Sequence, residues 1–218
     1  MGFMEISIIC YTNKGDDMKY INEITTHQIE IDKSKFIGVL MPISNEQDIE
    51  SNIEKVKNMY PKGNHYCYAA IYGEQATYAK MSDDGEPSRT AGAPIMEVLK
   101  HHDLTNVLCV VVRYFGGIKL GQGGLVRAYT KATSLVLQKT SLYEKAIHPI
   151  YELIFDYPLI QKVDNILLDA IMIKSKSFLD VVRYEVVLND ETYQKIDEIL
   201  YHLKGIKYLG DYELYVKI

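Results

Sequence analysis

A glycine-rich stretch between an apolar run and a helical pattern is the first feature of the sequence that could do chemistry. Five glycines lie within residues 116–124, inside "VVVRYFGGIKLGQGGLVRAYTKA". Glycines permit positive φ and close backbone approach, and free N–H groups at a helix start attract anions. No Asp or Glu occurs from Leu104 to Tyr143. These features predict a phosphate or nucleic-acid site. Its residues would be Arg113, Gly116, Gly117, Lys119, Gly121, Gln122, Gly123, Gly124, Arg127 and Lys131.

The stretch does not match the common nucleotide-binding fingerprints. A P-loop requires GxxxxGK[ST], but Gln122 and Gly123 follow Gly121. A dinucleotide fingerprint requires GxGxxG, but Val126 takes the place of its last glycine. The alternative is a tight connection in which the glycines serve only close packing, and the sequence leaves both interpretations open.

An acidic loop, "SDDGEPSRTAG", is the second feature. Its Asp83, Asp84 and Glu86 could offer oxygen ligands to a divalent cation, although the spacing is not that of an EF-hand. Acidic turns with Gly and Pro are usually solvated, so we predict no metal site. Ser88 and Thr90 could act as nucleophiles only beside a base. No Gly-x-Ser-x-Gly elbow occurs, so we predict no catalytic residue.

Several polar residues could face one cleft beside the glycine-rich stretch. His65 opens an apolar strand, where a histidine is more often a hydrogen-bonded structural residue than a catalyst. Arg113 lies at the end of a buried strand and could pair with Asp83 or Asp84 instead of contacting phosphate. The possible cleft residues are Lys35, His65, Asp83, Asp84, Glu86, Arg89 and Thr90.

Composition is that of an ordinary globular protein. The 218 residues are 47% hydrophobic and 24% charged, enough for one large domain or two small ones. The net charge of -5 gives no global signature for nucleic acid, but local anion sites remain open because salt screens distant charges. The three cysteines have no metal-ligand spacing, and their odd number argues against a disulfide framework. Without a signal peptide or an apolar run near 18 residues, we expect a cytoplasmic protein with no membrane partner. Separately, we expect no cofactor.

Hydrophobic patterns predict an N-terminal α+β region after an extension over residues 1–19. Two strands around "DKSKFIG" precede a helix that ends near Tyr60. A hairpin, the acidic loop, a short helix ending near "KHH" and the buried strand "NVLCVVVRYF" follow. A long helix is then predicted over residues 124–139, and this core domain should occupy residues 20–143.

The C-terminal part reads as a second α+β domain. From residue 148 the patterns follow the order β-α-β-β-α-β, the split βαβ or ferredoxin-like arrangement. We therefore predict a ferredoxin-like domain over residues 147–218.

Three motifs resemble the YigZ/IMPACT family: "KSKFIG" at 33–38, "SDDGEPSRTAGAP" at 82–94 and "VVVRYFGGIKLGQGGLVRAY" at 110–129. One departure is Arg89, which stands where the family usually has a small residue. The resemblance implies a core domain with the ribosomal-protein-S-five domain-two fold and a ferredoxin-like C-terminal domain like those of the translocating elongation factor. It also implies a link to translation, because eukaryotic IMPACT proteins regulate translation under amino-acid starvation.

Two functions from different classes remain open. The first is a non-enzymatic, translation-linked regulatory protein that binds RNA or the ribosome through the glycine-rich basic stretch, with a protein partner in translation control as a further candidate. The alternative is a small-molecule enzyme or nucleotide binder, with Mg²⁺ on the acidic loop 83–86 and phosphates on the glycine loop 116–124. The lack of an identifiable base or nucleophile disfavours the alternative.

Overall fold

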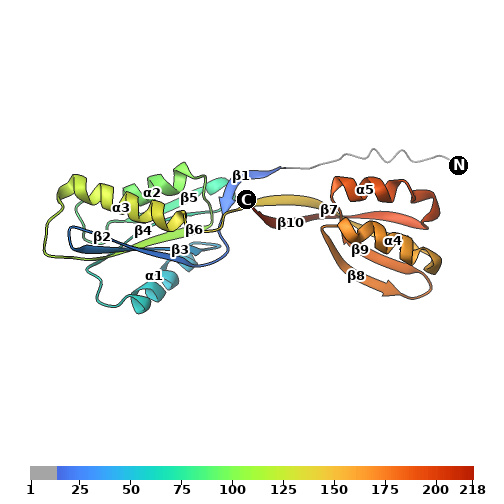
Figure 1. The fold of residues 1–218 in the computed structure, drawn as a ribbon, viewed down its shortest axis with the longest axis horizontal. Coiled ribbons are helices and arrows are strands. Elements are labelled where there is room, and N and C mark those ends of the chain that lie inside the picture. The colour runs from blue at the N-terminus through green and yellow to red at the C-terminus, as the bar shows by residue number, and fades with distance from the viewer. Residues whose placement is uncertain (1–13) are drawn as a thin grey trace. The chain divides into compact units, whose positions relative to one another are not determined.

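The computed structural model describes residues 14–218, which form two compact units. The N-terminal unit comprises Asp16–Lys145 with Tyr215–Ile218, and the C-terminal unit contains Ala146–Leu214 (Figure 1). The expected α+β class with two domains is confirmed. No helix within the described residues is both long and apolar enough to cross a membrane.

A five-stranded antiparallel sheet forms the centre of the N-terminal unit, in the order β2-β3-β6-β4-β5. Its strands are β2 (Thr25–Ile31), β3 (Ser34–Pro42), β4 (His65–Tyr72), β5 (Tyr78–Ser82) and β6 (Val107–Tyr114). The central strand β6 is buried on both faces, which explains its uninterrupted apolar sequence. A short 3₁₀ helix, η1 (Glu74–Ala76), joins β4 to β5.

Helices cover both faces of this sheet (Figure 1). Helix α1 (Gln47–Met59) packs on one face through Ile49 and Val56. Helices α2 (Gly92–His101) and α3 (Gly121–Leu137) pack together on the other face. The predicted long helix therefore exists, but it begins at Gly121, three residues before the predicted start, and so includes the last glycines of the stretch.

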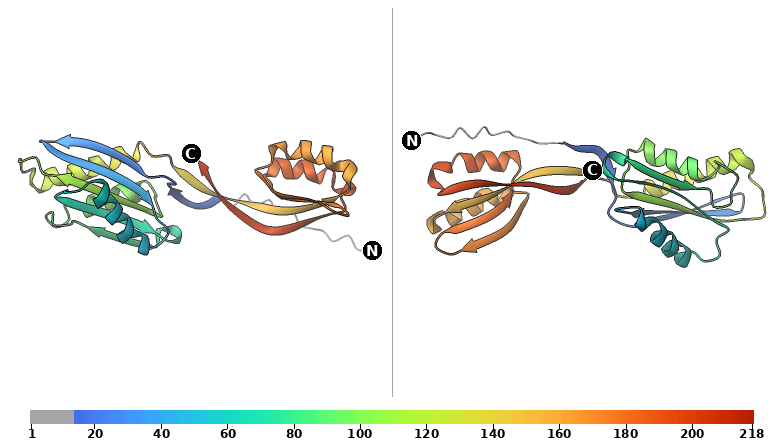
Figure 2. Two further views of the ribbon diagram at one scale, coloured as in Figure 1. Left: turned by 90° about the horizontal axis from the view of Figure 1, so that it is seen from below. Right: turned by 180° about the vertical axis from the view of Figure 1, so that it is seen from behind.

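The C-terminal unit has the predicted ferredoxin-like order (Figure 2). Its sheet runs β10-β7-β9-β8, and strand β1 (Lys14–Tyr20) also pairs with β7. The strands are β7 (Tyr143–Phe155), β8 (Met172–Phe178), β9 (Val182–Val187) and β10 (Gly205–Lys217). The helices are α4 (Ile160–Ile166) and α5 (Asp190–Asp197), with 3₁₀ turns η2 (Tyr157–Leu159), η3 (Leu167–Asp169) and η4 (Leu200–His202).

Two strand positions differ from the sequence prediction. Most of β1 lies in the predicted extension, and Lys19 bonds through its backbone to Asp103 (N···O 2.8 Å) and Thr105 (N···O 3.0 Å). The rest of that extension, residues 1–13, lies outside the described residues. Strand β7 begins at Tyr143 rather than near 148, so the two units divide within a continuous strand. Such pairings between distant segments leave little signal in the local pattern.

Candidate functional site

Asp83 organises the acidic loop between β5 and α2. Its Oδ1 accepts hydrogen bonds from the N–H groups of Ala91 (3.0 Å) and Gly92 (2.9 Å), and its Oδ2 accepts one from the N–H of Arg89 (2.7 Å). Burial opposes ionisation of this carboxyl, but the three N–H donors outweigh it and hold the pKa of Asp83 below its usual range. The carboxylate therefore serves as the cap of α2, supplied by a residue outside the helix.

Asp84 fastens the same loop to the start of β4. Its Oδ2 accepts a hydrogen bond from the N–H of Tyr66 at 2.6 Å, and its carbonyl oxygen lies 2.8 Å from Nδ1 of His65. Because a carbonyl can only accept, Nδ1 of His65 carries the donated proton. His65 thus has the structural, hydrogen-bonded position that the sequence favoured over a catalytic one.

Glu86 lies at the centre of a buried polar cluster that joins the loop to β6 and α3. Its Oε1 accepts hydrogen bonds from Nη1 of Arg113 at 2.6 Å and from the Tyr129 hydroxyl at 2.9 Å. Only 4% of the Glu86 side chain and 6% of the Arg113 side chain are exposed. The Arg113 guanidinium also lies over the rings of Phe36 and Phe115, with its Cζ 5.4 and 5.5 Å from their centroids.

The predicted role of Arg113 is therefore corrected. Its guanidinium is enclosed by Glu86 and two aromatic rings, so it has no surface on which to meet a phosphate. The pairing across the loop that was considered for Asp83 or Asp84 is made by Glu86 instead. The sequence could not distinguish three carboxylates within four residues.

Cys67 adds a second connection from β4 to this cluster. Its Sγ donates to the Asp83 carbonyl oxygen at 2.9 Å and lies 3.3 Å from the Tyr129 hydroxyl. Burial raises the pKa of the Cys67 thiol to about 12, so the group is a neutral donor and not a thiolate. Burial raises the pKa of Tyr129 as well.

The remaining residues of the predicted cleft differ in exposure. Thr90 is buried and its hydroxyl donates to the Pro87 carbonyl oxygen at 2.6 Å, whereas the Arg89 and Lys35 side chains are exposed. No group of three or more His, Cys, Asp or Glu side chains within residues 14–218 is arranged to hold a metal ion. The acidic loop is thus a folded structural element whose side chains bond largely to the protein itself.

The glycines at 116, 117 and 121 have two different structural roles. A Cβ on Gly116 would lie 2.0 Å from the carbonyl of Lys33, so only glycine permits this contact with the β2–β3 turn. The Gly116 N–H also donates to the Ser34 hydroxyl at 3.2 Å. Gly117 and Gly121 have φ of +87° and +67°, in the region that favours glycine. Packing and backbone freedom therefore account for these three positions.

A basic surface, exposed except for the half-buried Gly124, lies at the start of α3. We call it the α3 basic surface, and it consists of Lys119, Gly121, Gln122, Gly123, Gly124, Arg127 and Lys131. No side chain caps the helix and its first turn contains no acidic residue. A Cβ on Gly123 would lie 3.5 Å from Nη1 of Arg127, so the guanidinium lies against the first turn of the helix.

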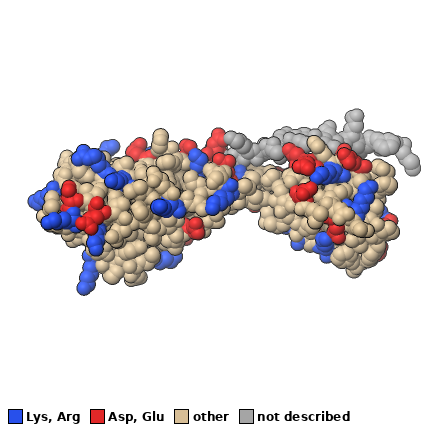
Figure 3. All heavy atoms as spheres, in the orientation of Figure 1, with Lys and Arg blue, Asp and Glu red and all other residues tan. Residues whose placement is uncertain are grey.

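Charges of both signs occur elsewhere on the molecule. Figure 3 shows basic and acidic side chains interspersed on the face that it draws. A partner that needed a uniformly positive face would find none in this view, so any anion site must be local, as the acid-free stretch 104–143 indicates.

Comparisons with known proteins place the chain in a family. The model of the Impact N-terminal domain matches residues 32–137. The IMPACT family member YvyE of Bacillus subtilis (strain 168) is 37% identical over 188 residues, which cover 86% of this chain and 87% of that protein. The chain belongs to the IMPACT family. This is a translation-related regulatory family, and every sequence-predicted site residue lies inside the matched IMPACT domain.

Two further comparisons agree with this assignment. The IMPACT family member YigZ of Escherichia coli (strain K12) is 34% identical over 140 residues, 63% of this chain and 69% of that protein. A solved structure described as "Crystal structure of an hypothetical protein" is 28% identical, with a TM-score of 0.57 over 88% of this chain and 96% of that one.

Sequence reasoning missed two features of this IMPACT domain. Tyr129 and Cys67 belong to the buried cluster, yet each occupies an apolar pattern that predicts only a core position. The second feature is a pocket between α1 and β4. Three separate stretches of chain line it, so no local sequence motif could predict it.

Proposed function

We propose that this protein is a non-enzymatic, translation-linked regulatory protein that binds RNA or the ribosome through the α3 basic surface. The observation that carries the proposal is the position of the Arg127 guanidinium against the exposed, uncapped first turn of α3. That arrangement combines a side-chain cation with the free N–H groups and positive dipole end of a helix of 17 residues.

Two lysines extend the same surface beyond the first turn. Lys131 lies one helical turn after Arg127, and Lys119 precedes the helix in the exposed connection from β6. Cations at this spacing suit successive phosphates of a nucleic-acid backbone. Such phosphate contacts would fix the position of the protein on the nucleic acid without reading its base sequence. Binding of this kind explains how a chain of net charge -5 could still hold a polyanion locally.

The acidic loop supports a non-enzymatic role. The Asp83 carboxylate accepts hydrogen bonds from backbone N–H groups, and the Glu86 carboxylate accepts from a guanidinium and a phenol. The Thr90 hydroxyl donates to a carbonyl oxygen. A nucleotide-binding enzyme would need carboxylates free for Mg²⁺ and a base beside a nucleophile.

Salt-dependent binding tests the proposal directly. Labelled single-stranded RNA and purified ribosomes are titrated with unmodified protein, Lys119→Ala and Arg127→Ala over a salt series. The log–log slope of affinity against salt should be about -0.7 for each contacted RNA phosphate, and each variant should flatten it by about that amount. Lys139→Ala is the matched control, because it removes an exposed cation from the acid-free stretch after the end of α3.

All three variants should melt within about 2 °C of the unmodified protein, since exposed substitutions away from special features change stability little. Unchanged affinity in both Lys119→Ala and Arg127→Ala would reject the proposal and leave packing as the role of the glycines. Loss of affinity in Lys139→Ala to the same extent would show that net charge, not the α3 basic surface, controls binding.

A further inference from the structure

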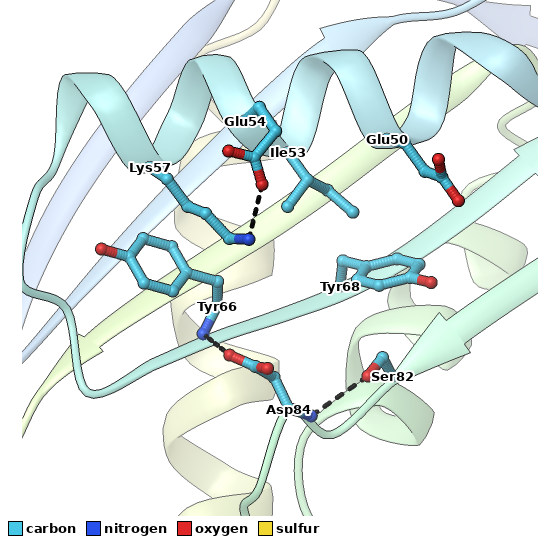
Figure 4. A pocket seen from close by; sticks show the side chains of 8 residues that line it. All are labelled: Glu50, Ile53, Glu54, Lys57, Tyr66, Tyr68, Ser82 and Asp84. Atoms are coloured by element: carbon cyan, nitrogen blue, oxygen red, sulfur yellow. Dashed lines mark hydrogen bonds and ion pairs between the residues drawn. The ribbon is translucent and has the colours of Figure 1, made fainter.

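A pocket of 330 Å³ lies between α1 and the strands β4 and β5 (Figure 4). Its lining residues are Glu50, Ile53, Glu54, Lys57, Tyr66, Tyr68, Ser82 and Asp84. In Figure 4 the side chains of α1 form one wall, Ser82 and Asp84 form the other, and the ring of Tyr68 lies between them. Helix α1 packs on the sheet face opposite α3, so this pocket is separate from the α3 basic surface.

The pocket carries an uncompensated negative charge. Its lining holds three carboxylates and one ammonium group. Lys57 donates to Oε1 of Glu54 at 2.6 Å, and this hydrogen bond raises the pKa of Lys57, so these two charges neutralise each other. Glu50 has no ion pair or hydrogen bond among the side chains that the structure describes, and Asp84 accepts only from the N–H of Tyr66. Asp84 also attracts Lys57 across the pocket without a direct contact, so three carboxylates share one ammonium group and Glu50 has no cationic partner among the described residues.

The floor of the pocket is aromatic and rigid. The hydroxyl of Tyr66 accepts from the N–H of Gly63 at 2.9 Å and donates to the Tyr60 carbonyl oxygen at 2.7 Å, which fixes that ring. Tyr68 is half-buried two residues further along β4, and Ile53 of α1 adds an apolar side chain to the lining. The negative face of an aromatic ring attracts ammonium and guanidinium groups, and its carbon surface accepts a methylene stem.

We infer that this pocket binds a small organic cation, with ammonium or guanidinium groups on an apolar stem. One cationic group would pair with Glu50 or Asp84 while the stem lies over Tyr68 and Ile53. A divalent metal fits poorly, because Mg²⁺ and Ca²⁺ require several oxygen ligands around one point and an aromatic ring separates these carboxylates. The volume lies in the range of pockets that hold small ligands, about 300–1,000 Å³.

Calorimetric titration of the full chain with spermidine and with agmatine tests the inference. We expect saturable binding that Glu50→Gln weakens by about five- to tenfold, between the effects of exposed ion pairs and of charge-assisted hydrogen bonds. Tyr68→Leu should weaken it by about two- to fivefold through loss of the cation–π contact, whereas Tyr68→Phe keeps the ring and should bind normally. Glu97→Gln removes an equal charge from the exposed side of α2 and should bind like the unmodified protein.

Three results would overturn the inference. The first is no saturable binding of either amine by the unmodified protein. The second is equal weakening by Glu97→Gln, which would indicate general charge attraction. The third is full displacement of spermidine by Mg²⁺ at matched ionic strength, which would indicate simple screening or a metal site. Arg127→Ala reports on RNA binding alone, so either proposal can fail without the other.

Discussion

Removal of the Glu86 carboxylate should destabilise the N-terminal unit far more than loss of an exposed charge pair. In Glu86→Ala the Arg113 guanidinium stays buried without its anionic partner, and its Nε has no hydrogen-bond partner among the described residues even with Glu86 present. Removing one partner of a buried ion pair typically costs about 3–5 kcal/mol. The Tyr129 hydroxyl loses its acceptor too, for a further penalty of about 1 kcal/mol.

The aromatic rings limit this loss. Phe36 and Phe115 remain against the guanidinium, and cation–π contacts of this kind contribute about 0.5–2 kcal/mol. We therefore expect Glu86→Ala to lower the free energy of unfolding by about 4 kcal/mol. At about 3 °C for each kcal/mol, the melting temperature should fall by roughly 10–15 °C.

Urea unfolding followed by far-UV circular dichroism measures this change. Lys80→Ala is the reference, because it breaks the exposed Glu46–Lys80 pair and should cost less than about 1 kcal/mol. The double variant Glu86→Leu with Arg113→Met should recover at least half of the loss, since apolar replacement of a buried pair is often neutral or stabilising. If Glu86→Ala and Lys80→Ala unfold at the same urea concentration, Arg113 is solvated in solution and the buried-pair argument is wrong.

Three other predictions follow from the N-terminal unit. Gly116→Ala should lower the melting temperature by several degrees because a Cβ there overlaps the β2–β3 turn, whereas Gly123→Ala should be neutral or stabilising; equal melts would contradict the close approach. Asp83→Asn should flatten the acid side of the stability–pH profile. The lowered pKa of Asp83 gives stability that is full above about pH 4 and is lost as the pH falls through the folded-state pKa. Cys67 and Cys109 should resist iodoacetamide at about pH 8 until urea unfolds the protein, because burial raises the pKa of both thiols to about 12; peptide mass spectrometry reads each site.

Local patterns were sufficient for most of the fold. The unbroken apolar run of β6 predicts a strand buried on both faces, and Pro61 marks the helix end one residue after Tyr60, the C-cap of α1. The β-α-β-β-α-β order likewise follows from periodicity alone. The start of α3 at Gly121 could not be predicted from local periodicity, because three of its first four residues are glycines, which are poor helix formers. Tertiary packing decides their conformation.

The candidate site was less predictable because its chemistry depends on contacts between distant segments. The sequence identifies the motif around Gly116 but not the Lys33 carbonyl that makes glycine necessary there. It identifies an arginine at the end of β6 but not that Glu86, 27 residues earlier, encloses it. Side-chain type and spacing indicate which groups can react, whereas burial and partners determine which of them remain available.

Asp83 and Asp84 show this limit most directly. They are adjacent and chemically identical, yet Asp83 turns its carboxylate into the start of α2 and Asp84 lines the pocket beside α1. The difference arises at the backbone, where Asp84 and Gly85 have φ of +40° and +84° at the centre of a turn closed by the Glu86 N–H and the Asp83 carbonyl oxygen. One carboxylate then stabilises the fold, and the other adds negative charge to the pocket on the opposite face of the sheet from the α3 basic surface. Because the buried Glu86 binds Arg113 of β6 and Tyr129 of α3, it fixes the loop that carries both carboxylates, although Glu86 itself lines neither the pocket nor the α3 basic surface.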